Sequence, residues 1–564
     1  MTDDLGAEAM TIVEKTEVRI SGLQRAVVLH LQRLNLTIPV TRLPRRRKNG
    51  LKRCPTCQES YTDETLKFCR IDGALLISDS SDLESSETAL LSQQGSSNPP
   101  IDEVQARTPS IAVLPFVNMS VDREQEYFCD GLAEELINAL SKTEDLKVAA
   151  RTSAFSFKGK DVKVSEIGQA LNVGAVLEGS VRKAGKRLRI IVQLINASDG
   201  YHLWSERYDR QMEDVFEIQD EITLAIVEAL KVKLLGAERA ALLKRHTENT
   251  EAYHLYLKGR YYWNKRTELK KGLGYFQQAI ELDPNYALSY VGLADSYNLL
   301  AGHSGLSPKE NFPRAKAAAL KALELDGKLA EAHASLGFVM YRFDWDWLGA
   351  EREFKRALKM NPSYATASHW YGEFLALMGR FGESIAKMTK AQELDPLSLP
   401  INTDLGQAFF FARQYNQAEE QFHKTLEIDP NFVRAHVLLG DCYEQMLRYD
   451  EAEAEFQKAV DLSGGKTLAM AALGHAYAMS GKRTAAQKML DDMMELARQD
   501  YVSPYDIAVI HTGLGERDLA FAWLNKACQD RSVWLVCLQV DPRLDSLRQD
   551  ARFTDLLQGV NLRA

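Results

Sequence analysis

The pattern of apolar and polar residues changes sharply at about residue 110. Before it, no sustained helical or strand period is present; after it, apolar runs and helical periods follow one another. The run SIAVLPFVN (110–118) predicts a buried strand. EQEYFCDGLAEELINALSK (124–142) predicts a helix, because Leu132, Leu136 and Leu140 recur at helical spacing.

The same reading continues to residue 235. LKVAAR (146–151) predicts a second strand and VSEIGQALNV (164–173) a short helix. Three strands follow in 174–210, with turns predicted at 183–186 and 196–200 from their Gly, Asn and Lys content. A long amphipathic helix is predicted over 212–235. This order of elements indicates an α+β domain over residues 110–234.

From about residue 250 the pattern becomes purely helical and repeats. A small residue recurs with spacings of 35, 43, 35, 34, 34, 34 and 34, and a second column of small residues follows it by twelve positions. The first column consists of Gly259, Ala294, Gly337, Gly372, Gly406, Gly440, Gly474 and Ala508. The spacing of 43 predicts a loop insertion near residues 301–312.

This period closely resembles the tetratricopeptide repeat, as in HVLLGDCYEQMLRYDEAEAEFQKAVDL. The resemblance covers residues 250–530 and implies about eight helix–turn–helix units stacked into an all-α solenoid. The segment 531–564 resembles the end of many such arrays and is expected to cap the last apolar face.

The resemblance also implies a partner-binding groove. In such repeats the positions three before and one after the small residue face the concave side. The predicted groove residues are Tyr256, Arg260, Asp295, His369, Glu373, Gln407, Asp441 and His475. The surface is mixed in charge, and the Lys/Asn set of chaperone-tail readers is missing.

The domain at 110–234 resembles the TolB-like N-terminal domain that accompanies tetratricopeptide arrays in bacterial regulators. The matching stretches include SIAVLPFVNMS, ARTSAFSFKGK and DGYHLWSERYDR. The resemblance implies a sensory or interaction module without catalytic residues. Its charged side chains, among them Arg151 and Glu178, fit either an anion pocket or the solvent face of a half-buried sheet.

Three of the seven cysteines lie close together near the start of the chain. Cys54 and Cys57 form one knuckle, and Cys69 with Asp72 has the same two-residue gap. Zinc takes four ligands and accepts a carboxylate oxygen beside thiolates. Residues 51–77 therefore resemble a small zinc-ribbon-like module with structural zinc, because so short a segment needs a metal in place of a core. Three unliganded cysteines in a vestigial module remain the alternative.

The flanking segments differ from any folded domain. Residues 1–50 form an unassigned basic tail with the run Arg45–Lys48, and residues 78–109 are Ser-rich, acidic and Pro-containing, which predicts a disordered linker. Leu51-Lys52-Arg53-Cys54 stands where such zinc modules often begin with Met-Lys-Arg-Cys. We therefore hypothesise that Leu51 is an alternative start and that residues 1–50 are not native.

Composition narrows the function. A net charge of −9 over 564 residues argues against bulk nucleic-acid binding. No apolar stretch is long enough to predict a membrane span, and no signal peptide is evident, so a cytoplasmic protein is expected. The sequence SGGKT at 463–467 lacks the first glycine of a phosphate loop, and no kinase or hydrolase motif is present.

The sequence thus predicts a non-enzymatic, multidomain interaction or signalling scaffold that binds a protein or peptide in the solenoid groove. Two alternatives stay open. One is a transcriptional regulator that contacts DNA through its N-terminal region. The other is the regulatory part of a cyclase or kinase system. The sequence does not determine the identity of the partner or the oligomeric state.

Overall fold

A computed structural model describes residues 52–53, 60–61, 77–78 and 108–562, except 144, 235–238, 241, 267 and 304–306. The chain divides into two compact units, 1–101 and 102–564. In the first, strand β1 (Lys52–Arg53) pairs antiparallel with β2 (Ser60–Tyr61) and β3 (Ile77–Ser78). The predicted zinc ligands Cys54, Cys57, Cys69 and Asp72 lie outside the described residues.

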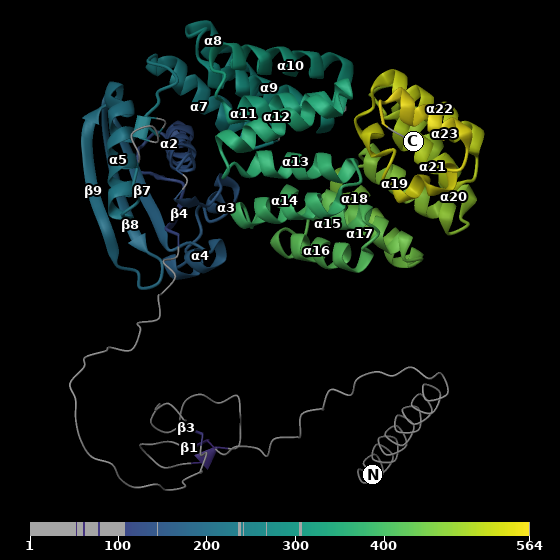
Figure 1. Ribbon diagram of the computed structural model, residues 1–564, viewed down its shortest axis with the longest axis horizontal. Helices are drawn as coiled ribbons and strands as arrows, with labels where there is room; N and C mark the ends of the chain where they lie inside the picture. The colour runs from purple at the N-terminus through teal and green to yellow at the C-terminus, as the bar shows by residue number, and fades with distance from the viewer. Residues whose placement is uncertain are drawn as a thin grey trace, which may run out of the picture. The chain divides into compact units, whose positions relative to one another are not determined.

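The second unit begins with an α/β domain (Figure 1). Its strands are β4 (Ser110–Val113), β5 (Val117–Asn118), β6 (Lys147–Val148), β7 (Ala175–Ala184), β8 (Arg187–Asn196) and β9 (His202–Gln211). Its helices are α2 (Glu126–Leu140), α3 (Arg151–Phe155), α4 (Val164–Leu171) and α5 (Val215–Ala229).

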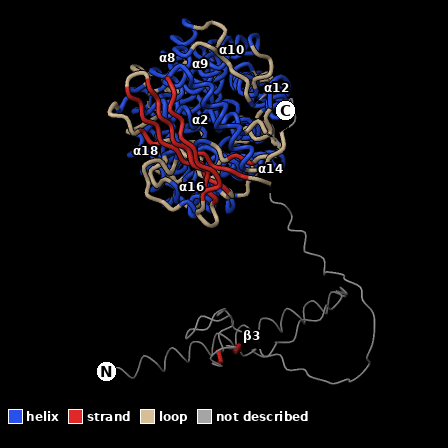
Figure 2. Tube along the Cα trace, turned by 90° about the vertical axis from the view of Figure 1, so that its left-hand side faces the viewer, coloured by secondary structure: helices blue, strands red, loops and turns tan. Residues whose placement is uncertain are grey.

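The sheet is mixed, in the order β6-β4-β7-β8-β9. β4 pairs parallel with β6 and β7, whereas β7, β8 and β9 form an antiparallel meander. The strands lie side by side as one layer in Figure 2. The turns predicted after Ala184 and Asn196 are the two hairpin connections of this meander.

Each face of the sheet has its own core, because side chains alternate along a strand. In β4, Ile111 and Val113 pack with α2 and α5, while Ala112 packs on the other face with α4. In β8, Leu188 and Ile190 are fully buried. Arg187 and Arg189 alternate with them at exposed positions, as a half-buried antiparallel strand requires.

Eight antiparallel helix pairs follow in the described part of the chain. The pairs are α7 (Thr250–Asn264) with α8 (Leu269–Leu282), α9 (Ala287–His303) with α10 (Pro308–Leu325), α11 (Ala330–Val339) with α12 (Trp347–Met360), α13 (Ala365–Leu377) with α14 (Phe381–Leu394), α15 (Leu399–Phe411) with α16 (Tyr415–Ile428), α17 (Val433–Gln445) with α18 (Tyr449–Ser463), α19 (Thr467–Met479) with α20 (Arg483–Leu496), and α21 (Pro504–Gly513) with α22 (Arg517–Asp530). We number these pairs as units 1 to 8.

The small-residue column explains how the two helices of a unit approach each other. A Cβ atom added at Gly406 or Gly440 would lie 2.4 or 2.6 Å from the ring of Phe422 or Phe456 on the second helix. Glycine therefore leaves the space that a buried phenylalanine fills. The pair of glycine and phenylalanine recurs in units 1, 3, 5 and 6, and close packing of this kind is one physical basis of the repeat pattern.

The α/β domain is fixed to both unit 1 and unit 4. Glu134 of α2 accepts hydrogen bonds from Arg151 and from Arg260 of α7, each at 2.8 Å. At the other contact, the backbone N–H of Ala150 donates to the carbonyl of Leu394 at 2.8 Å, and that of Ser153 donates to the Asp395 carboxylate at 2.9 Å. The domain therefore spans the first half of the solenoid.

One predicted strand is shorter than expected, and one expected loop is largely helical. The second strand stops at Val148, and Arg151 begins helix α3, because Ser153 bonds to Asp395 of the solenoid instead of continuing the sheet. The expected loop insertion at 301–312 is largely helical: α9 has 17 residues and α10 has 18, against 13 to 15 in most other solenoid helices.

Candidate groove site

The C-terminal segment packs against several units of the solenoid. It contains two short 3₁₀ helices, η4 (Val533–Cys537) and η5 (Pro542–Leu547), and helix α23 (Ala551–Gly559). Trp347 of unit 3 donates its indole N–H to the carbonyl of Val560 at 3.0 Å. Arg413, in the turn of unit 5, donates to the carbonyl of Val540 at 2.8 Å. The segment thus contacts units far from the last one.

Its burial makes this segment a permanent part of the solenoid. Leu535, Val536, Leu538, Leu544 and Leu547 are all fully buried. Burying one such side chain contributes roughly 1.5–3 kcal/mol, so displacing the segment would cost on the order of 10 kcal/mol. A partner therefore meets a groove that this segment already fills in part. The sequence predicted a cap on the last unit and did not predict this wider role.

The predicted groove residues of units 1 and 2 make contacts inside the chain. Tyr256 lies in the core against Phe276 and Tyr286 and is 4% exposed. Arg260 is ion-paired with Glu134. Asp295 is buried, and burial raises its pKa to about 6. Contact of these three side chains with a partner stays a prediction.

Three predicted residues, two in unit 4 and one in unit 7, form buried ion pairs. Glu373 pairs with Arg342 and accepts a hydrogen bond from the Tyr341 hydroxyl at 2.8 Å. His369 lies 2.6 Å from Asp404. His475 lies 2.9 Å from Glu444, and both side chains are almost fully buried. These contacts hold neighbouring units together, because each joins two adjacent units.

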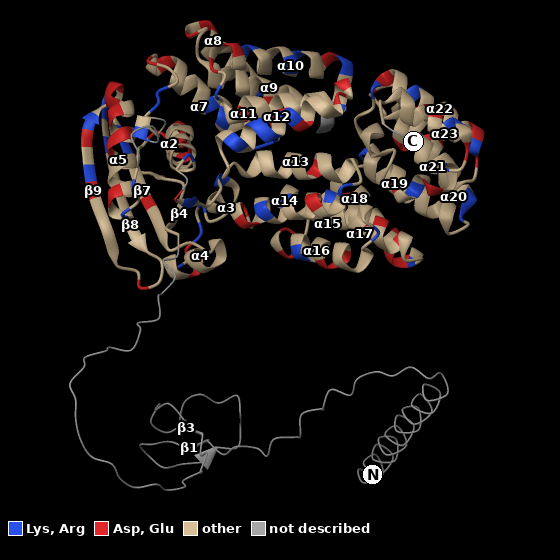
Figure 3. Ribbon diagram, in the orientation of Figure 1, with Lys and Arg blue, Asp and Glu red and all other residues tan. Residues whose placement is uncertain are grey.

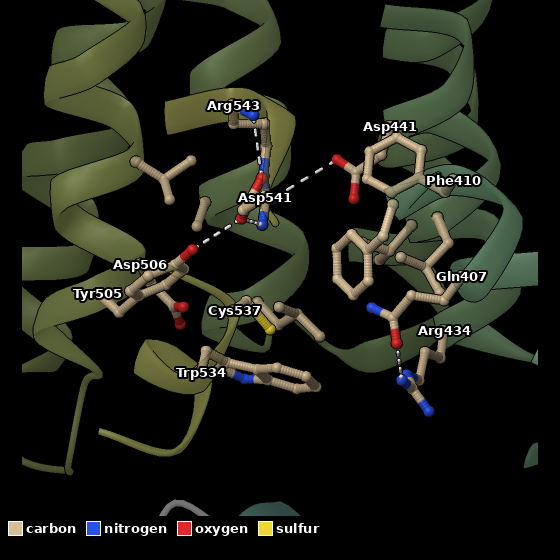
Figure 4. A pocket seen from close by; sticks show the side chains of 16 residues that line it. Gln407, Phe410, Arg434, Asp441, Tyr505, Asp506, Trp534, Cys537, Asp541 and Arg543 are labelled. Carbon is tan, nitrogen blue, oxygen red and sulfur yellow. Dashed lines mark hydrogen bonds and ion pairs between the residues drawn. The ribbon is translucent and has the colours of Figure 1, made fainter. Parts of the chain in front are cut away.

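Gln407 and Asp441 are the two predicted residues that line a common cavity, of about 40 Å³ (Figure 4). Its walls come from α15, α17, α19 and α21 and from the C-terminal segment. Solvent reaches Arg434, Leu468, Trp534 and Arg543 among the lining residues, so the cavity opens on their side. Gln407 accepts a hydrogen bond from Arg434 at 2.9 Å.

Charge in this cavity is unevenly balanced. The guanidinium of Arg543 binds Asp541 with its Nη2 at 2.7 Å from Oδ2. Burial alone would raise the pKa of Asp541, but the charge and hydrogen bonds of Arg543 hold it below its usual value. Asp441 is left 3.5 Å from the same guanidinium, and its Oδ1 atom has no hydrogen-bond partner among the described residues.

Asp506 has a hydrogen bond with Thr467 in place of an ion pair. It is 4% exposed, and among the described residues no ion pair reaches it. Burial raises the pKa of Asp506 to about 7, and burial likewise raises that of Asp441 to about 7. The raised values report burial that the positive charge of Arg543 does not fully offset.

Sequence reasoning missed Asp506, Trp534 and Arg543. The rule of three before and one after the small residue, applied to Ala508, gives Tyr505 and Val509, which do line the cavity. That signal was available for unit 8. Trp534 and Arg543 carried none, because only tertiary folding brings the C-terminal segment against α17.

The described residues contain no cluster of His, Cys, Asp and Glu suited to a metal ion. No described helix has the length and apolar character needed to cross a membrane. Lys, Arg, Asp and Glu are interspersed over the helices and alternate along β9 (Figure 3).

Family comparisons support two parts of the chain. Residues 106–225 match the second domain of HilA/YgeH-like transcriptional regulators. Residues 346–398 and 403–466 match the tetratricopeptide repeat. The C-terminal region is therefore a solenoid of tetratricopeptide repeats, preceded by an α/β region.

Similar proteins have differing names. The putative adenylate cyclase 3 of Rhizobium meliloti is 40% identical over 240 residues, which are 41% of this chain and 40% of that protein. The transcriptional regulator HilA of Salmonella typhimurium is 22% identical over 298 residues, 52% of each chain. The structure of Pseudomonas aeruginosa PilF covers 38% of this chain and 93% of its own, with 22% identity and a TM-score of 0.30. The match spans 40% of the length of the putative adenylate cyclase and 52% of that of HilA, so the chain covers about half, or less, of these two curated relatives.

Proposed function

We propose that the protein is a non-catalytic regulatory scaffold that binds a protein or peptide on the open part of its solenoid groove. The tetratricopeptide match supports a role in protein interaction. The observation that carries the proposal is the solvent-reached wall of the groove beside the C-terminal segment, formed by Arg434 and Trp534 at the opening of the cavity. Aromatic and arginine side chains are enriched at protein interfaces.

The α/β domain supplies the regulatory part of this proposal. Its likeness to a TolB-like module and to the second domain of HilA-like regulators supports sensing or docking. Because buried contacts join it to units 1 and 4, binding at the α/β domain can alter how these units pack. The same proposal places the protein in the cytoplasm.

Crosslinking of the full chain in its native cells, followed by mass spectrometry, tests the groove. Trp534→Ala removes an aromatic side chain at the cavity opening, and Leu348→Ala, on a side chain 74% exposed in α12, is the matched control. Crosslinks to a partner should be lost in Trp534→Ala and kept in Leu348→Ala. Equal crosslinking in both variants would contradict the proposal.

The match to HilA favours one second candidate, a transcriptional regulator that contacts DNA. The run Arg45–Lys48 is the basic part of the N-terminal region. Binding of the full chain to duplex DNA should then weaken steeply as salt rises, with a smaller slope after replacing these four residues with Gln. Absence of binding at low salt would eliminate this candidate.

The relative named as an adenylate cyclase raises a third candidate, a role in cyclase signalling. As a scaffold, the purified chain should form no cyclic nucleotide from ATP.

Structural zinc at Cys54, Cys57, Cys69 and Asp72 also stays a proposal. Metal analysis of the intact protein and of Asp72→Ala tests it, and an intact mass near 63.4 kDa would refute the hypothesis of a start at Leu51.

A further inference from the structure

The groove cavity contains two carboxylates with too little positive charge beside them. Asp441 projects from α17 and Asp506 from α21, and in Figure 4 they lie on opposite sides of the space. Both are at most 4% exposed. Ionised side chains this deeply buried are normally paired or hydrogen-bonded on all their oxygens.

The arginines of the cavity do not supply the missing charge. Arg543 makes its short contacts with Asp541 and reaches Asp441 only at 3.5 Å. Arg434 pairs with Asp404, 2.5 Å away, and donates to Gln407. Hence each guanidinium already has a carboxylate at short range. Among the described residues Asp506 has no ion pair within 4.0 Å, and it keeps only a hydrogen bond with Thr467 and the more distant charge of Arg543.

The walls suit an organic cation better than a metal ion. Phe410 and Tyr505 line the same cavity, and aromatic rings attract ammonium and guanidinium groups. The ring of Trp534, which also lines it, already has the guanidinium groups of Arg342 and Arg434 at 5.5 and 5.8 Å from its centroid. A volume of about 40 Å³ exceeds what one water molecule needs, which is about 10–15 Å³ on the same measure. A planar guanidinium or an ammonium head could therefore enter from the side of Arg434 and Trp534.

We propose that this cavity binds the cationic head of a Lys or Arg side chain that a partner protein inserts between Asp441 and Asp506. The inference rests on the proposed function, because it names the chemistry of the partner in the groove. It does not require the C-terminal segment to leave, since only one side chain enters. A free amine or guanidinium compound shares this chemistry and is distinguished below.

The first experiment tests the site without any partner. Methylguanidinium chloride is titrated into the full chain, with sodium chloride at equal ionic strength as reference, and the fluorescence of Trp534 is followed as the difference between the native chain and Trp534→Phe. A saturable change is expected. In Asp506→Asn the apparent affinity should fall about tenfold or more, as expected when a hydrogen bond to a buried charge is lost.

Asp492→Asn is the matched control. It removes the same charge from an exposed position of α20 and should leave the affinity unchanged. Asp506→Asn is isosteric and removes an uncompensated buried charge, so it should fold; circular dichroism checks this. No saturable change in the native chain, or equal affinity in Asp506→Asn, would overturn the proposal.

The second experiment identifies the source of the cation. An immobilised library of random heptapeptides is incubated with the native chain, Asp492→Asn and Asp506→Asn, and the retained peptides are sequenced. Lys and Arg should be enriched by the first two proteins and not by Asp506→Asn. If peptides are retained without that enrichment, the proposal that a partner inserts a Lys or Arg side chain is overturned, and a free small cation is the ligand. Retention of no peptide at all would instead count against the proposed groove function.

Discussion

At the scale of single residues, the groove is defined by side chains whose charges are balanced unequally. Arg543 satisfies Asp541, whereas Asp441 and Asp506 keep raised pKa values because the charge of Arg543 offsets their burial only in part. A carboxyl group of this kind binds its proton more tightly in the folded state than in the unfolded chain. Its effect on stability is therefore visible as a dependence on pH.

Asp506→Asn should change how stability depends on pH. The folded pKa of about 7 lies above the value of about 3.9 in an unfolded chain, so the folded state binds the proton more tightly. The stabilising contribution is full below about pH 4 and is lost as pH rises through 7. Relative to the native chain, the variant should gain on the order of 1 kcal/mol or more between pH 5 and pH 8, measured by urea unfolding. An unchanged difference would contradict the assignment.

Gly440→Ala should destabilise unit 6. Its new Cβ would lie 2.6 Å from the Phe456 ring, and overpacking of this kind costs about 1–3 kcal/mol. Gly274→Ala, in the interior of α8, is the matched control, because no heavy atom lies within 4 Å of its added Cβ. There the gain in helix propensity, about 1 kcal/mol, should stabilise the protein. Thermal unfolding of both variants checks the opposite signs.

At the scale of elements, periodic patterns predicted the strands and helices whose positions depend on packing against a neighbouring element. The alternation in β8 and the small-residue column gave the strand and the helix pairs, because each records contacts with a neighbouring element. The helix at Arg151 could not be predicted in this way. It depends on Ser153 meeting Asp395, a contact between residues 242 positions apart.

Glu134→Gln should loosen the α/β domain from unit 1. Burial would raise the pKa of Glu134, but Arg260 and Arg151 hold it below its usual value, so the carboxylate is charged. Breaking a buried ion pair on one side costs about 3–5 kcal/mol. Hydrogen exchange in α2 and α7 should therefore become faster. Glu126→Gln, on the same helix but 41% exposed beside Lys158, should change exchange little; equal effects would refute the role of Glu134.

At the scale of the whole molecule, the sequence predicted the order of the domains' elements but not how the array is closed. Part of the candidate site was accessible to the repeat rule, because Gln407, Asp441 and Tyr505 stand at fixed positions relative to the small residues. Another part comes from the C-terminal segment. Its contacts join residues about 200 positions apart, such as Trp347 and Val560, and no local period records them.

If this segment holds the solenoid together, a cavity made in it should be felt in distant units. Leu544 is fully buried in η5, and Leu544→Ala should cost about 2–5 kcal/mol. Hydrogen exchange should accelerate in α12 and α15. The segment contacts α12 through Trp347, and it contacts the turn that follows α15 through Arg413. Leu519→Ala, on a side chain 48% exposed in α22, removes the same atoms from the last unit and should leave those helices protected. Acceleration confined to α21 and α22 in Leu544→Ala would show that the segment only caps the array, because a cap transmits its loss to the neighbouring unit alone.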